Sequence, residues 1–180
     1  MNRQEITEFS PSGSSMHTRG MAALLKPGRD VAMLASIQIL CFLALTRLEP
    51  RFFIIHLYQV IPYVAIMLLV GYGRERWAYM IGPLVSLVWL GLAYIAGLLG
   101  SAMERLRSFE RPSRETDFVA VLAVVTAVVA LLMIVLCRIH WVKQNLERGE
   151  AWRTFLVSLT IVVAYYAILL RWFWDMIPNA

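Results

Sequence analysis

The sequence predicts an all-α protein, a polytopic transmembrane helix bundle of about five spans in which the first two helices form a tight hairpin. Hydrophobic residues make up 59% of the chain and charged residues 16%, whereas soluble domains have about 45–50% and about 25%. The apolar residues are also gathered in blocks: residues 118–137 and 154–170 contain no Asp, Glu, Lys, Arg or His. In lipid, helices of this kind satisfy every backbone polar group internally.

Residues 1–30 have a different composition from the rest of the chain. The run Ser-Pro-Ser-Gly-Ser-Ser at residues 10–15 is small and polar, and such a run cannot bury enough apolar surface to become ordered. Glu5 and Glu8 occupy the place where a secretory signal carries basic residues. We therefore expect a disordered polar N-terminal tail, followed by a transmembrane helical domain over residues 31–176.

Five apolar segments bounded by charged residues are the predicted spans. They cover about residues 31–48, 52–72, 77–103, 118–137 and 153–174. The first is short against the ~20 residues that a bilayer requires, and Arg47 can lengthen it by reaching toward the headgroups. Pro50 disfavours a continuous helix between the first two segments. These two spans are therefore expected to form the tight hairpin.

Aromatic and basic residues mark the ends of these segments. Tryptophan favours the headgroup zone, and five of the six tryptophans lie at predicted span ends: Trp77, Trp141, Trp152, Trp172 and Trp174. The basic residues are slightly more numerous on the side of the N-terminus. The positive-inside rule then places the N-terminus in the cytoplasm, and we expect an integral protein of a cell membrane, the inner membrane of a prokaryote.

Small residues predict where the third and fourth helices approach each other. Ala93, Gly97 and Ser101 are four residues apart, and a second stripe recurs at three-residue and four-residue spacing: Ala120, Ala123 and Ala127. Such faces let helix backbones pack closely. We expect the two stripes to pack on each other within one chain. A dimerisation face or a docking groove for another subunit is the alternative.

Polar side chains within the first two spans form a candidate ligand-binding notch. Gln38, His56, Tyr58 and Gln59 supply hydrogen-bonding groups in otherwise apolar segments. The structural interpretation is a hydrogen bond between Gln38 and Gln59 across the hairpin. The functional interpretation is a pocket for a quinone or lipid headgroup, which a few polar groups would orient.

The sequence predicts no catalytic site, no metal site and no cofactor. His56 and His140 could in principle ligate a haem, but the predicted spans separate them by roughly 25–30 Å along the membrane normal. Cys41 and Cys137 lie far apart in different spans, so they provide neither a disulfide framework nor a zinc motif. No motif of a membrane hydrolase or metalloprotease is present.

Three functions remain open at this level. The first is a non-catalytic integral membrane protein that acts as an accessory or assembly subunit of a membrane complex. The second is a small transporter or channel that works as an oligomer, and the third is a lipid- or quinone-binding protein. The expected partners are membrane lipids, complex subunits or further copies of the chain, and not nucleic acid, because the net charge of +5 lies between apolar blocks. Residues 104–117 alternate acidic and basic side chains, which is typical of a solvated helix extension or a partner contact.

Overall fold

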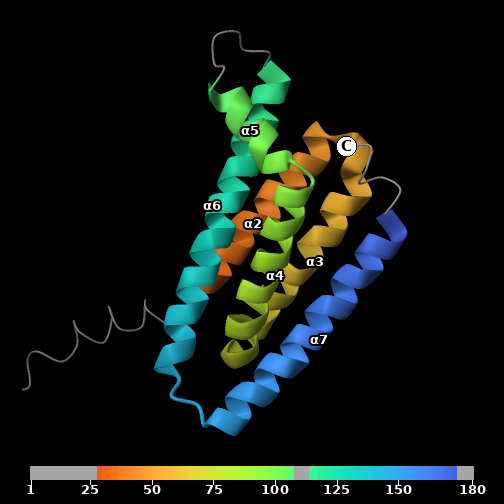
Figure 1. Ribbon diagram of the computed structural model, residues 1–180. Helices are drawn as coiled ribbons and strands as arrows, with labels where there is room; N and C mark the ends of the chain where they lie inside the picture. The colour runs from red at the N-terminus through yellow and green to blue at the C-terminus, as the bar shows by residue number, and fades with distance from the viewer. Residues whose placement is uncertain (1–27, 108–113, 174–180) are drawn as a thin grey trace, which may run out of the picture.

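The computed structural model describes residues 28–107 and 114–173, and this part of the chain is helical, without strands (Figure 1). The α-helices are α2 (Arg29–Leu48), α3 (Phe53–Gly71), α4 (Glu75–Ile95), α5 (Leu98–Arg107), α6 (Arg114–Lys143) and α7 (Arg148–Phe173), and a short 3-10 helix, η1 (Pro50–Phe52), precedes α3. The predicted N-terminal tail lies almost wholly outside the described residues.

Five segments are long and apolar enough to cross a membrane: Arg29–Leu48, Pro50–Gly71, Glu75–Ile95, Phe118–Lys143 and Arg148–Trp172. Each also turns large apolar side chains outward, for example Leu40, Ile54, Leu87, Leu131 and Val163. Apolar surface of this extent is stable in lipid and not in water. The predicted fold class is confirmed, and the protein is an integral membrane protein.

The first two spans form the predicted tight hairpin. Leu48 ends α2, and the Glu49 N–H donates to the carbonyl of Leu45 at 2.8 Å, which closes the last turn. Pro50 then begins η1, and α3 starts at Phe53. The two helices pack on each other more extensively than any other pair in the described chain.

Four helices form a closed ring. α2 packs on α3, α3 on α4, α4 on α6, and α6 returns to α2. Neighbours in the ring run in alternating directions (Figure 1). Phe42 of α2 fills the interior, with its ring centroid 5.8 Å from those of Tyr63 on α3 and Trp89 on α4. The fifth span, α7, lies outside the ring and packs mainly on α4.

The third predicted span differs from the structure, because residues 77–103 do not form one helix. α4 ends at Ile95, and Gly97 has a φ of 69°, which interrupts the helix before α5 begins. Glycine adopts this left-handed conformation without the steric cost that a side chain brings. At 1.5 Å per residue the 21 residues of α4 already span about 31 Å, close to the hydrocarbon thickness.

The α5–α6 arm is the part of the molecule that extends beyond the ring. α6 has 30 residues, so it is about 45 Å long and exceeds the ~30 Å hydrocarbon core. α5 packs along α6, and the two project together past the other helices (Figure 1). We use the name α5–α6 arm for residues 98–107 and 114–117.

Candidate functional site

The predicted notch residues lie in the hairpin, but their contacts lead to different places. Gln38 is completely buried and its Nε2 donates to the carbonyl of Thr126 on α6 at 3.4 Å. The expected hydrogen bond between Gln38 and Gln59 was therefore wrong. The physical reason is ring closure: α6 packs directly on α2 and offers Gln38 an acceptor from outside the hairpin.

Tyr58 and His56 have neighbours of their own. The Tyr58 ring stacks on Tyr165 of α7 at 4.3 Å between centroids, and its hydroxyl donates to the Tyr165 carbonyl at 3.2 Å. His56 lies beside Phe52, with centroids 6.4 Å apart. Gln59 is half-buried on α3. These contacts do not join the four residues into one notch, and ligand binding by them stays a prediction.

The predicted packing stripes are only partly buried. Ala93 and Ala120 are buried, and Ala123 and Ala127 are half-buried, whereas Gly97 and Ser101 are exposed. A Cβ added at Gly97 would meet nothing within 4 Å. Gly97 is therefore a helix break and not a point of close approach, although α4 and α5 both pack on α6.

The close approach between α4 and α6 lies earlier along α4. A Cβ built at Gly82 would come within 3.0 Å of the Cys137 Sγ and 3.6 Å of Met133. Gly82 belongs to a buried stripe with four-residue spacing, together with Ala78 and Ser86. The sequence contains both small-residue repeats, but the prediction used the more C-terminal one, which contains Gly97, and not the one that contains Gly82.

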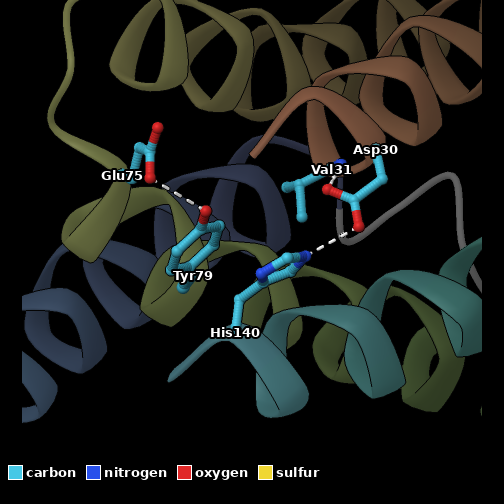
Figure 2. Close-up of polar contacts among 5 residues, drawn as sticks. All are labelled: Asp30, Val31, Glu75, Tyr79 and His140. Atoms are coloured by element: carbon cyan, nitrogen blue, oxygen red, sulfur yellow. Dashed lines mark hydrogen bonds and ion pairs between the residues drawn. The ribbon is translucent and has the colours of Figure 1, made fainter. Parts of the chain in front are cut away.

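A second polar cluster joins three helices at the end of the bundle where α2 begins (Figure 2). His140 of α6 donates from Nε2 to the Asp30 Oδ2 of α2 at 2.7 Å. The His140 ring stacks on Tyr79 of α4, with centroids 5.0 Å apart and an interplanar angle of 16°. The Tyr79 hydroxyl donates to Glu75 at 3.0 Å. We call Asp30, Glu75, Tyr79 and His140 the end cluster.

The end cluster is at the boundary between the buried interior and solvent. The side chain of His140 is 17% exposed and that of Asp30 is 42% exposed. Asp30 engages both carboxylate oxygens, since its Oδ1 also accepts from the Val31 N–H at 2.9 Å. A carboxylate in the first turn of a helix is stabilised by the helix dipole. The cluster therefore acts as a clamp that fixes the start of α2 against α4 and α6.

Gly28 allows the chain to enter this clamp. Its φ is 93°, and a Cβ at this position would lie 3.0 Å from the Tyr79 hydroxyl and 3.2 Å from Val70. Both the backbone conformation and the lack of space require glycine. Sequence reasoning missed the end cluster, because Asp30 and His140 are 110 residues apart and no local pattern links them.

The two histidines lie at opposite ends of the bundle. His56 is near the start of α3 and His140 near the end of α6, and Figure 1 shows these helix ends on opposite sides. They cannot ligate one iron. Among the residues that the structure describes, no group of three or more His, Cys, Asp or Glu side chains is arranged to hold a metal ion.

Comparison with protein families, with curated proteins and with solved structures finds no match for this chain. The functional argument therefore depends on the geometry alone.

Proposed function

We propose that this chain is a non-catalytic integral membrane protein that serves as an accessory or assembly subunit of a membrane complex. The observation that carries the proposal is the α5–α6 arm, which stands beyond the bundle (Figure 1). Its surface mixes apolar and charged side chains: Leu98 and Met103 are each 48% exposed, and Glu104 and Arg107 are exposed as well. Protein interfaces likewise combine apolar and polar side chains.

The polar interior of the bundle supports the same proposal. Gln38, Tyr58 and Tyr165 use their side chains for contacts between helices, and Tyr166 donates to the Val85 carbonyl at 3.5 Å. Such interhelical bonds stabilise packing in lipid. These residues contribute to a rigid scaffold, which suits a subunit that positions a partner.

Photo-crosslinking from the arm tests the proposal. A photoreactive amino acid replaces Met103 on the arm, and in a matched variant it replaces Leu131, which is 54% exposed on the lipid-facing side of α6. A subunit gives one discrete protein adduct at Met103 and only lipid adducts at Leu131. An adduct of twice the chain's own mass would indicate an oligomer of this protein. Lipid adducts alone at both positions would contradict the subunit proposal.

We further propose a cytoplasmic N-terminus in the inner membrane of a prokaryotic cell. The bundle end that holds the start of α2 collects Arg29, Arg74, Arg76, Arg138, Lys143, Arg148 and Arg153. Positively charged segments favour the cytoplasmic side. A membrane-impermeant maleimide added to intact cells should then label Arg51→Cys and leave Asn145→Cys unlabelled, because these positions lie in connections at opposite ends. Cys41 and Cys137 are buried. Labelling of Asn145→Cys alone would show that the protein has the opposite orientation in the membrane.

A further inference from the structure

The bundle end that holds the starts of α2, α4 and α7 uses most of its acidic side chains internally. Three of them form a hydrogen bond or an ion pair with a neighbour: Asp30 with His140, Glu75 with Tyr79, and Glu150 with Arg76. Glu147 is the one further acidic residue that the structure describes at this end. Little acidic charge therefore remains there to neutralise basic side chains.

Several basic side chains at the same end are exposed. Five of them form no ion pair with an acidic side chain that the structure describes: Arg74, Arg138, Lys143, Arg148 and Arg153. Four of these five flank a single connection. Lys143 ends α6 and Arg148 begins α7, while Arg138 and Arg153 lie about 7.5 Å further along each helix axis. We call Arg138, Lys143, Arg148 and Arg153 the basic connection.

Tryptophans indicate that the basic connection lies at headgroup depth. One tryptophan stands on each side of the connection, Trp141 on α6 and Trp152 on α7. Tryptophan favours the boundary between hydrocarbon and water. The start of α7 adds partial positive charge through the helix dipole. The cations are therefore at the level where the surrounding lipids carry their phosphate groups.

Large apolar side chains accompany the cations and select the kind of partner. Ile139 and Val142 are exposed beside the cations of α6, and Leu156 and Val157 are exposed within about one turn of Arg153 on α7. A soluble anion or a nucleic acid would meet only the cations. A phospholipid meets both kinds of group, because its phosphate reaches the cations and its acyl chains lie along the apolar side chains.

We propose that the basic connection binds anionic phospholipid headgroups, with the acyl chains against the exposed apolar residues of α6 and α7. Basic clusters next to transmembrane helices attract anionic lipids, and each cation near the surface contributes about fivefold in affinity. The site lies at the end of the bundle opposite the α5–α6 arm (Figure 1). It is therefore independent of any protein that the arm contacts.

Native mass spectrometry of the full chain in mild detergent tests the proposal, with phosphatidylglycerol and phosphatidylcholine of the same acyl chains as probes. The wild-type chain should bind phosphatidylglycerol more tightly. Lys143→Gln combined with Arg148→Gln removes two cations and should weaken the first phosphatidylglycerol bound by roughly 25-fold. The matched control is Arg47→Gln combined with Arg171→Gln, which removes the same charge from exposed positions at the opposite end. Its affinity should equal that of the wild-type chain.

Each outcome supports or overturns the site. A preference for phosphatidylglycerol that the first variant loses and the control keeps supports it. Equal binding of the two lipids by the wild-type chain overturns it, and so does an equal loss in the two variants, because net charge alone would then explain the binding. If the first variant fails to fold, Arg138→Gln combined with Arg153→Gln removes the other two cations and gives the same comparison.

A soluble headgroup tests the part of the apolar side chains. Glycerol phosphate carries the phosphate without acyl chains, so it should not displace phosphatidylglycerol from the wild-type chain at equal concentration. Displacement at that concentration would contradict a phospholipid site, because binding would then need only the cations.

Discussion

The Tyr165 hydroxyl of α7 donates to the carbonyl of Tyr58 on α3, which is the acceptor that Pro62 leaves without a helix partner. In a regular helix the N–H of residue 62 would bond to the carbonyl of residue 58, but proline has no N–H. The neighbouring helix thus repairs a defect created by a residue four positions along α3. Because the Tyr58 hydroxyl donates in return to the Tyr165 carbonyl, the two tyrosines bond reciprocally.

Loss of the Tyr165 hydroxyl should cost stability only while Pro62 is present. Tyr165→Phe keeps the stacked ring and should lower the free energy of unfolding by about 0.5–1.5 kcal/mol, the value of one such hydrogen bond. In a Pro62→Ala background the helix supplies its own N–H, and the cost should shrink. Unfolding in mixed micelles measures both values. Equal costs in the two backgrounds would show that the bond does not compensate for proline.

Gly82 should tolerate no side chain while Cys137 is opposite. Gly82→Ala places a Cβ 3.0 Å from the Cys137 Sγ and should destabilise the protein by roughly 1–3 kcal/mol, as overpacking does. Cys137→Ala removes that sulfur, so the double variant should be less destabilised than the two single changes added together. Strict additivity in a thermal-unfolding cycle would argue against the contact.

Gly28→Ala should destabilise the bundle by roughly 1–3 kcal/mol, because the left-handed backbone is strained for alanine and the new Cβ crowds the Tyr79 hydroxyl. Gly71→Ala is the matched control, since it ends α3 with nothing within 4 Å. Its stability should be unchanged or rise by up to about 1 kcal/mol. Equal melting temperatures for the two variants would exclude a special role for Gly28.

Substitutions at Gly97 distinguish backbone strain from crowding. The positive φ should make Gly97→Ala and Gly97→Leu similarly unfavourable, by about 1–2 kcal/mol, because neither side chain meets a neighbour at its Cβ. Gly97→Asn should cost less, since asparagine tolerates this conformation. If the helices approached closely here, a stability series in detergent would instead show that Gly97→Leu is far less stable than Gly97→Ala.

The bond between Asp30 and His140 should contribute modestly, since Asp30 is 42% exposed. We expect Asp30→Ala to lower the free energy of unfolding by about 0.5–1.5 kcal/mol. His140→Phe retains an aromatic ring on Tyr79 and should be less harmful than His140→Ala, which loses the stack as well. Ranking the three variants by chemical unfolding tests this. If His140→Phe and His140→Ala lose the same free energy of unfolding, the ring stack does not contribute to stability.

The sequence was sufficient for the spans and the hairpin, because blocks of apolar residues bounded by charge are a property of the chain itself. It was not sufficient for the partner of Gln38, which depends on which helix closes the ring. The break at Gly97 was also missed, since the apolar pattern continues through Leu98 and Leu99 and does not reveal a backbone angle. The end cluster required the fold, because each of its bonds between helices joins residues remote in sequence.

The position of α7 has a consequence for biogenesis. The ring of α2, α3, α4 and α6 is complete once Lys143 has emerged, and α7 packs mainly on α4, with a smaller contact to α3. A nascent chain can therefore assemble a closed four-helix unit in the bilayer while its last span is still being synthesised. The reciprocal tyrosine pair would then form last, when α7 packs on the completed ring.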